Sequence, residues 1–79
     1  MRVYLVKKIN ATHIRYYNMS LMQTLFGEIE FECVYGNIAF KSHTGKKVRF
    51  FQSMDEAGKR LEQVLMKKLK RGYQKRMHH

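Results

Sequence analysis

The clearest pattern in the chain is a strict alternation between Glu28 and Tyr35. Apolar side chains occupy every second position, and glutamates fill the first three positions between them. Because successive side chains of a strand point to opposite faces, this pattern predicts a β-strand with one buried and one solvated face. We expect the glutamates of the solvated face to pair with Lys or Arg on a neighbouring strand.

Two strands and a loop are predicted before this segment. Residues 3–9 are rich in β-branched side chains, and residues 13–22 carry apolar and aromatic side chains at strand-like spacing. The short polar break between the two segments predicts a hairpin. Leu25 and Phe26 lie in the loop that follows, where we expect them to fill the end of the core.

The chain after the alternating segment predicts a connection and a further strand. The connection runs from Gly36 to Gly45 and has room for a short strand over residues 38–40. Residues 46–52 alternate again, with one apolar side and one side that mixes cations with Phe51. The pattern leaves open which of these two sides faces the core.

A helix over residues 53–71 is the last predicted element. Ser53 and Glu56 have the spacing of a capping box, in which the serine oxygen accepts a hydrogen bond from the third helical residue. Apolar residues recur at helical spacing between Ala57 and Leu65. Lysines crowd the last turn before a glycine, which is a typical end of a helix.

These elements predict an α+β fold, an antiparallel β-meander of four to five strands with one C-terminal helix packed on a face. The length allows one domain over residues 1–79. We expect an ordered core over residues 3–73 and a flexible basic tail over residues 74–79. His78 and His79 fit both a native terminus and the remnant of a tag, so we assign them no role.

The charge of the chain adds a partner class to this outline. The formal net charge is +10. Residues 1–40 hold four Lys or Arg against three Glu, whereas residues 41–79 hold twelve against three acidic residues. This asymmetry indicates a polyanionic partner such as nucleic acid or an anionic membrane. The alternative is a basic domain whose charge serves only solubility.

Several other classes are not expected. The sequence has no run of about 18 apolar residues, so it predicts no membrane span, and we expect no membrane partner. A single cysteine excludes an internal disulfide and fits a reducing cytoplasm. His13 and His43 have no obvious orienting Asp, and no Cys/His pair has metal-ligand spacing. We therefore expect a non-catalytic monomer without metal or cofactor.

The candidate site is Tyr35-Gly36-Asn37 with the cations around it. An aromatic ring at a Gly turn offers a stacking face, and cations neutralise phosphates. The candidate cations are Lys41, Lys46, Lys47, Arg49, Lys67, Lys68, Lys70 and Arg71. Two alternatives stay open, because the ring of Tyr35 continues the apolar alternation and can pack in the core, and because the cations can be solvated charges.

Other aromatic residues are expected to pack rather than to bind. The residues considered for a stacking platform and expected in the core are Tyr16, Tyr17, Phe50 and Phe51. Tyr73 is expected to close the end of the helix.

Five stretches, in their order and spacing, resemble the WGR domain. This family is named for a Trp-Gly-Arg tripeptide and occurs in DNA-dependent poly(ADP-ribose) polymerases and as small bacterial proteins. The stretches are Arg15-Tyr16-Tyr17-Asn18-Met19, Leu25-Phe26-Gly27, Val34-Tyr35-Gly36-Asn37-Ile38, Ser53-Met54-Asp55-Glu56-Ala57 and Lys67-Lys68-Leu69-Lys70-Arg71-Gly72-Tyr73. Of the signature only Gly36 remains, since Tyr35 stands in the place of Trp and Asn37 in the place of Arg.

The resemblance implies a non-catalytic domain that binds nucleic acid, DNA rather than RNA, with low sequence specificity. In the polymerase members the signature Trp stacks near a DNA end. The resemblance therefore implies a preference for ends or breaks if the ring of Tyr35 is exposed. The expected location is the cytoplasm, on the nucleoid if DNA is the ligand. The alternative is a protein-interaction module that docks on an acidic partner protein through the same basic half.

Overall fold

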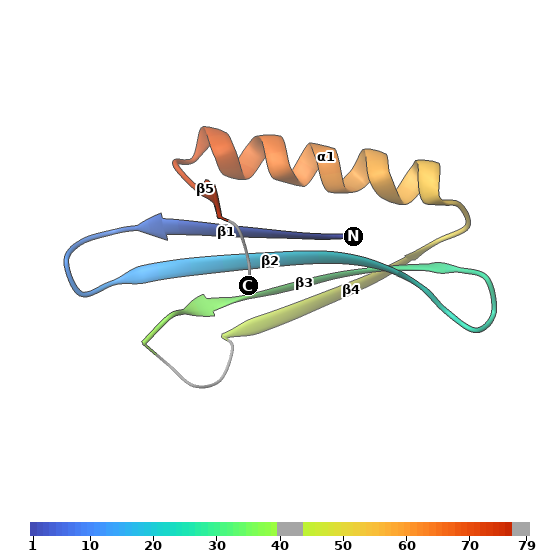
Figure 1. Cartoon of the computed structure of the whole chain (residues 1–79), viewed down its shortest axis with the longest axis horizontal. Coiled ribbons are helices and arrows are strands. Elements are labelled where there is room, and N and C mark those ends of the chain that lie inside the picture. The colour runs from blue at the N-terminus through green and yellow to red at the C-terminus, as the bar shows by residue number, and fades with distance from the viewer. Residues whose placement is uncertain (40–43, 77–79) are drawn as a thin grey trace.

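A five-stranded antiparallel sheet with one helix across a face forms the protein (Figure 1). The computed structural model describes residues 1–39 and 44–76. The elements are β1 (Arg2–Lys8), β2 (Ile14–Gln23), β3 (Ile29–Asn37), β4 (Gly45–Phe51), α1 (Met54–Lys70) and β5 (Gln74–Arg76). The strand order is β4-β3-β2-β1-β5. This architecture confirms the predicted α+β class.

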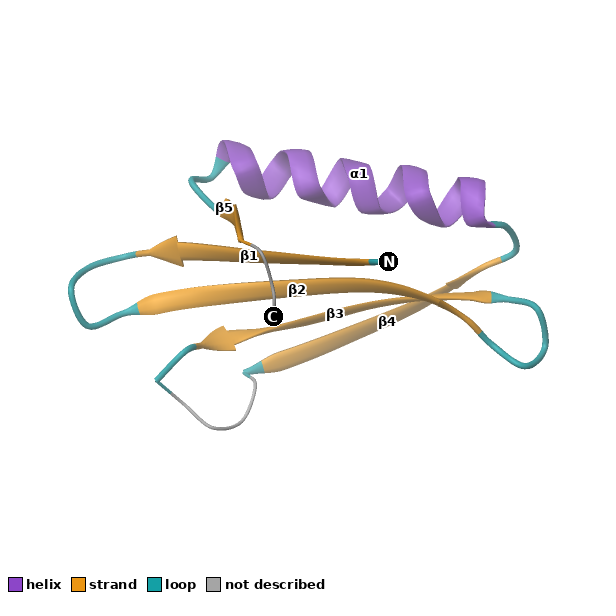
Figure 2. Cartoon of the chain, viewed as in Figure 1, coloured by secondary structure: helices purple, strands orange, loops and turns teal. Residues whose placement is uncertain are grey.

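The core lies between α1 and one face of the sheet, as Figure 2 shows. The inward residues of the three central strands alternate with outward ones, and they are buried against Ala57, Leu61 and Leu65 of the helix. The opposite face of the sheet carries no helix (Figure 2). On that face, Lys46 Nζ lies 3.2 Å from Glu32 Oε2, which confirms the expected pairing with a neighbouring strand for Glu32.

The start of α1 follows the predicted capping box. Ser53 is extended, and its side chain accepts a hydrogen bond from the Glu56 N–H at 3.2 Å. This bond satisfies one of the donors that a helix leaves free at its first turn. Asp55 and Glu56 also place negative charge at the positive end of the helix dipole.

The end of α1 reverses the chain onto the sheet. Gly72 has a φ of 99°, and its N–H donates to the carbonyl of Leu69 at 3.1 Å. The Tyr73 N–H donates to the carbonyl of Lys68, also at 3.1 Å. These two bonds form a Schellman motif, whose left-handed position suits glycine.

Residues 74–76, predicted as part of a flexible tail, instead form β5 beside β1. The tail prediction is therefore wrong for these residues, because the reversal at Gly72 lays their backbone along the hydrogen-bonding edge of β1. The remainder of the predicted tail lies outside the described residues. No helix in the described part of the chain is long and apolar enough to cross a membrane.

The predicted Gly turn at Tyr35-Gly36-Asn37 is wrong, because all three residues belong to β3. Strand pairing continues through them, with Tyr16 opposite Gly36 and Arg15 opposite Asn37. The chain turns only after Asn37, whose Oδ1 accepts the Ala39 N–H at 2.9 Å. The short strand predicted for 38–40 is likewise wrong at residues 38–39, which form a turn, and Phe40 lies outside the described residues.

The role predicted for Leu25 and Phe26 is also wrong. Both lie in the connection between β2 and β3 and are almost fully exposed. The end of the core is occupied instead by Phe51, which packs against it and lies 6.3 Å from the ring of Phe31. The side of β4 that carries Lys47, Arg49 and Phe51 therefore faces the helix side of the sheet. Phe50 lies on the uncovered face.

Candidate functional site

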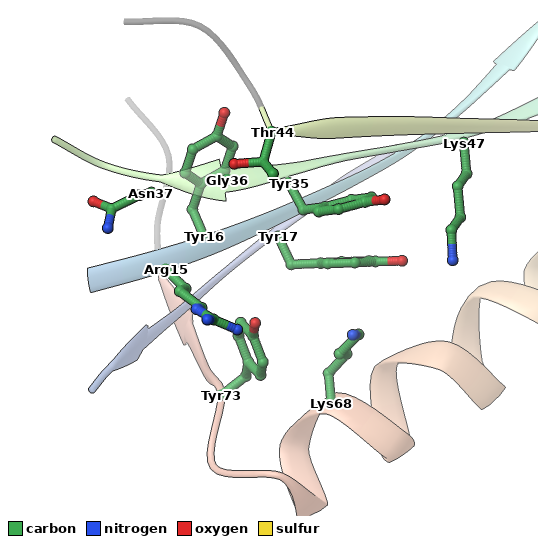
Figure 3. A pocket seen from close by; sticks show the side chains of 10 residues that line it. All are labelled: Arg15, Tyr16, Tyr17, Tyr35, Gly36, Asn37, Thr44, Lys47, Lys68 and Tyr73. Carbon is green, nitrogen blue, oxygen red and sulfur yellow. The ribbon is translucent and has the colours of Figure 1, made fainter. Parts of the chain in front are cut away.

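A concave pocket of about 470 Å³ opens where β3 and α1 end (Figure 3). Its lining residues are Arg15, Tyr16, Tyr17, Tyr35, Gly36, Asn37, Thr44, Lys47, Lys68 and Tyr73. They come from β2, β3, the bend before β4, β4 itself, α1 and the turn after the helix. The pocket therefore depends on the tertiary fold, and no single stretch of sequence carries it.

Two stacked tyrosines form one wall of the pocket. Tyr17 and Tyr35 are directly opposite each other on β2 and β3, and their rings lie 5.6 Å apart at an angle of 12°. The ring of Tyr73 meets Tyr17 edge-on at 6.4 Å and 71°. Figure 3 shows the Tyr17 and Tyr35 rings parallel, with both hydroxyls on the side of Lys47. The wall thus offers aromatic surface with polar ends.

Gly45 makes room for the ring of Tyr35. The two residues are opposite each other on β4 and β3. A Cβ built on Gly45 would lie 2.7 Å from Tyr35 Cε2 and closer still to Oη and Cζ. Atoms cannot approach so closely, so an alanine here requires the ring to move.

Gly36 has a similar role on the uncovered face. A Cβ on Gly36 would lie 2.8 Å from the backbone nitrogen of Thr44 and 3.2 Å from Tyr16 Oη. The signature glycine therefore lets the start of β4 approach β3 closely.

Cations from separate elements surround the aromatic wall. Lys68 Nζ lies 4.3 Å from the ring centroid of Tyr17 and 5.5 Å from that of Tyr73. Lys47 Nζ lies 6.0 Å from the centroid of Tyr35, and Lys47 also lines the pocket. Arg15 also lines the pocket, and none of the lining residues is acidic. The pocket consequently carries positive charge that no carboxylate of its own lining neutralises.

The environment of Lys68 shows the same imbalance. Burial lowers the pKa of its ammonium, and the cations of Arg71 and Lys47 lower it further. An anion bound beside Lys68 would offset the repulsion from these cations and favour the charged form of the Lys68 ammonium. The site is therefore electrostatically suited to an anionic group beside aromatic rings.

The phenol of Tyr17 is a neutral hydrogen-bonding group. Burial raises its pKa, and a side-chain hydrogen bond with Cys33 raises it further. Burial also raises the pKa of the Cys33 thiol. Neither group has the lowered pKa of an activated nucleophile.

The structure brings five of the predicted site residues together. Tyr35, Gly36, Asn37, Lys47 and Lys68 all line the pocket. The ring of Tyr35 is half-buried, because it stacks on Tyr17 and packs against the core. It is therefore part of a wall, and it is not displayed at a turn.

The other predicted cations lie elsewhere. Lys46 is on the uncovered face beside Glu32, and the Arg49 guanidinium lies 6.0 Å from the ring of Phe51. Three residues at the end of α1 are exposed and do not line the pocket, namely Lys67, Lys70 and Arg71. Lys41 lies outside the described residues.

Sequence reasoning did not assign Arg15 or Thr44 to the site, and it assigned Tyr16, Tyr17 and Tyr73 to packing alone. The packing roles are correct for Tyr17, which is buried, and for Tyr73, which packs against the core. The core assignment is wrong for Tyr16 and Phe50, which lie on the uncovered face of the sheet.

Two signals were available for Tyr17 and Tyr73. Tyr17 lies two positions before the next buried residue of β2, so its side chain points to the same face. Antiparallel pairing then places it beside an inward-facing residue of β3. Tyr73 directly follows the helix terminator, where a Schellman motif brings it back to Lys68.

Residues 1–39 and 44–76 contain no group of three or more His, Cys, Asp or Glu side chains that could hold a metal ion. The whole chain, residues 1–79, matches the model of the WGR domain, a family of nucleic-acid-binding modules. No curated protein and no solved structure matches the chain.

Proposed function

The chain belongs to the WGR domain family, and we propose that it binds DNA without catalysing a reaction, with low sequence specificity and a preference for strand ends or breaks. DNA is proposed over RNA because the family occurs in poly(ADP-ribose) polymerases that depend on DNA for their activity. The observation that carries the proposal is the pocket, in which stacked tyrosines and three cations meet without an acidic residue.

Phosphate neutralisation supplies the affinity in this proposal. Arg15, Lys47 and Lys68 reach the pocket from three elements, so together they can contact phosphates of one backbone segment. Each contact releases condensed counterions, which makes the affinity depend on salt. With three phosphates neutralised, the expected slope predicts that the affinity falls about 40-fold between about 50 and 200 mM salt.

The concave shape supports the preference for ends. Bases inside a duplex are stacked on both sides and present no free ring face to a pocket, although their backbone phosphates remain accessible to cations. A terminal nucleotide can enter the pocket and place its sugar or base against the half-buried rings of Tyr35 and Tyr73, while its phosphate meets Lys68. Low specificity is expected because α1, the helix of residues 1–39 and 44–76, packs across the sheet, and these residues offer no further helix to read base edges.

Fluorescence anisotropy with a labelled blunt duplex tests the proposal at both salt concentrations. Lys68→Met keeps the aliphatic stem and removes the charge, so it should weaken binding and reduce the salt slope by about one unit. Lys46→Met is the matched control, because Lys46 lies on the uncovered face beside Glu32. Equal losses in the two variants would refute the pocket as the binding site.

A duplex whose two ends are closed by hairpin loops tests the preference for ends. It should bind more weakly than the blunt duplex of the same length, and equal affinity would refute that preference. No binding to any duplex at low salt would favour the alternative, an acidic partner protein.

A further inference from the structure

The end of the molecule opposite the pocket exposes a group of large apolar side chains. These residues, named the apolar tip, are Met22 at 63% exposure, Leu25 at 101%, Phe26 at 90%, Phe50 at 55% and Met54 at 52%. Figure 1 shows the β2–β3 connection and the start of α1 together at this end. Exposed apolar side chains that gather in one region mark interaction surfaces more often than isolated ones do.

Acidic residues adjoin the apolar tip in the strand register and along the chain. Glu30 lies directly between Met22 and Phe50 in the strand register, and Glu28 immediately precedes β3. Asp55 and Glu56, in the first turn of α1, follow Met54. The tip therefore fits a surface that combines exposed apolar side chains with Lys or Arg.

The outer surface of α1 near its end has this complementary composition. Met66 and Leu69 are three residues apart and exposed, so they lie on one face of the helix. Lys67 and Lys70 flank them in the last turn. This group, named the helix patch, lies at the end of α1 that is near the pocket, far from the tip (Figure 1).

We propose that the apolar tip docks on the helix patch of a second copy of this chain. The inference rests on the proposed function, because a net charge of +10 on each copy opposes association until a polyanion neutralises it. The two surfaces differ and lie at opposite ends, so the contact is heterologous and forms open rows rather than closed pairs. Copies bound side by side on one duplex hence bind cooperatively.

The length of the molecule sets the duplexes for a test. Its longest extent is 43 Å, and a duplex rises about 3.4 Å per base pair, so one copy lying along the axis covers about 13 base pairs. A duplex of about 14 base pairs with both ends closed by hairpin loops then holds one copy, and a closed duplex of about 56 base pairs holds about four. Closed ends make all sites internal, so the preference for ends does not enter the comparison.

Binding isotherms on both duplexes, for the wild type and the double variant Leu25→Ser with Phe26→Ser, test the proposal. Both substituted side chains are exposed, so the fold should persist. The wild type should bind the long duplex cooperatively, with a Hill coefficient above unity. The variant should keep the wild-type affinity for the short duplex and lose cooperativity on the long one. Cooperativity in the variant, or its absence in the wild type, would overturn the proposal.

Charge exchange tests the assigned partner surface. Glu30→Lys and Lys70→Glu should each reduce cooperativity, and their combination in one chain should restore it, because the two charges meet between neighbouring copies. Failure of the combination to restore it would overturn the pairing of tip with helix patch.

Sedimentation without DNA separates failure of this inference from failure of the proposed function. At about 1 M salt the Debye length falls to about 3 Å, so the long-range repulsion between copies is screened. The direct apolar contact between the apolar tip and the helix patch is not screened and should hold the copies together. The wild type should then associate as its concentration rises, and the double variant should not. Association under these conditions supports the inference even if no DNA is bound, and a wild type that remains monomeric there would contradict it.

Discussion

Gly45→Ala should disrupt the aromatic wall without removing any functional side chain. The added Cβ would lie 2.7 Å from Tyr35 Cε2, and an ordinary carbon contact needs more than about 3.5 Å. The ring of Tyr35 stacks on Tyr17 at 5.6 Å, so it cannot move away from β4 without disturbing that stack. Either the ring rotates out of the pocket or β4 moves away from β3.

The expected cost has two parts. Overpacking of this kind destabilises a protein by about 1–3 kcal/mol, and because β4 is an edge strand that can yield, we expect the lower half of this range. For binding, the loss of an aromatic contact with a nucleotide costs about 1–3 kcal/mol. DNA affinity should consequently fall between about 5-fold and about 150-fold.

A double-mutant cycle measured by anisotropy and by thermal unfolding tests this reasoning. Tyr35→Ala removes the ring with which the new Cβ would clash. If Gly45 acts only through that ring, adding Gly45→Ala to Tyr35→Ala should change DNA affinity no further. Full additivity of the two effects, or unchanged affinity in Gly45→Ala alone, would refute the assigned role.

Two further predictions concern stability. Gly58→Ala should stabilise the protein by about 0.5–1 kcal/mol, since Gly58 lies inside α1 and a Cβ there meets nothing within 4 Å. The melting temperature should rise by several degrees, and DNA affinity should not change. A lower melting temperature would show that the added Cβ does not lie in open space. Stability should also decline as the pH rises above about 10, because unfolded Tyr17 ionises near its ordinary pKa whereas burial raises the pKa of the folded phenol. Denaturation at about pH 8 and about pH 11 should show a smaller decline in Tyr17→Phe than in the wild type, and identical declines would exclude Tyr17 as the source.

Local sequence patterns predicted the parts of the fold that local physics determines. The alternation before Tyr35 defined β3 because one face of that strand is buried and the other is charged. The capping box defined the start of α1 because Ser53 satisfies a backbone donor. The turn predicted at Gly36 was wrong because glycine, although common in turns, here lies within β3. Its missing side chain allows the backbone of Thr44 to lie close to that strand.

The candidate site was less predictable because it depends on register. Charge counting identified Lys47 and Lys68, but the same criterion selected Lys46, whose single-residue offset puts it on the other face beside Glu32. Arg15 and Tyr17 join the pocket only because β2 pairs with β3 in a particular register. A pattern within one segment cannot determine that register, so sequence reasoning found the cations without finding their grouping.

The substitution of Trp by Tyr in the signature has a structural counterpart in the wall. Tyr35 does not act alone, since Tyr17 lies directly across the strand pair and stacks on it. The buried ring of Tyr17 covers one face of Tyr35 and holds that ring in the pocket wall, and Lys68 lies over Tyr17. The charge that the signature Arg would bring is absent at Asn37, whereas Arg15, its cross-strand neighbour, lines the same pocket. Paired residues of β2 therefore supply what the signature of β3 lacks, which explains how a chain with one of three signature residues can keep an aromatic and cationic pocket.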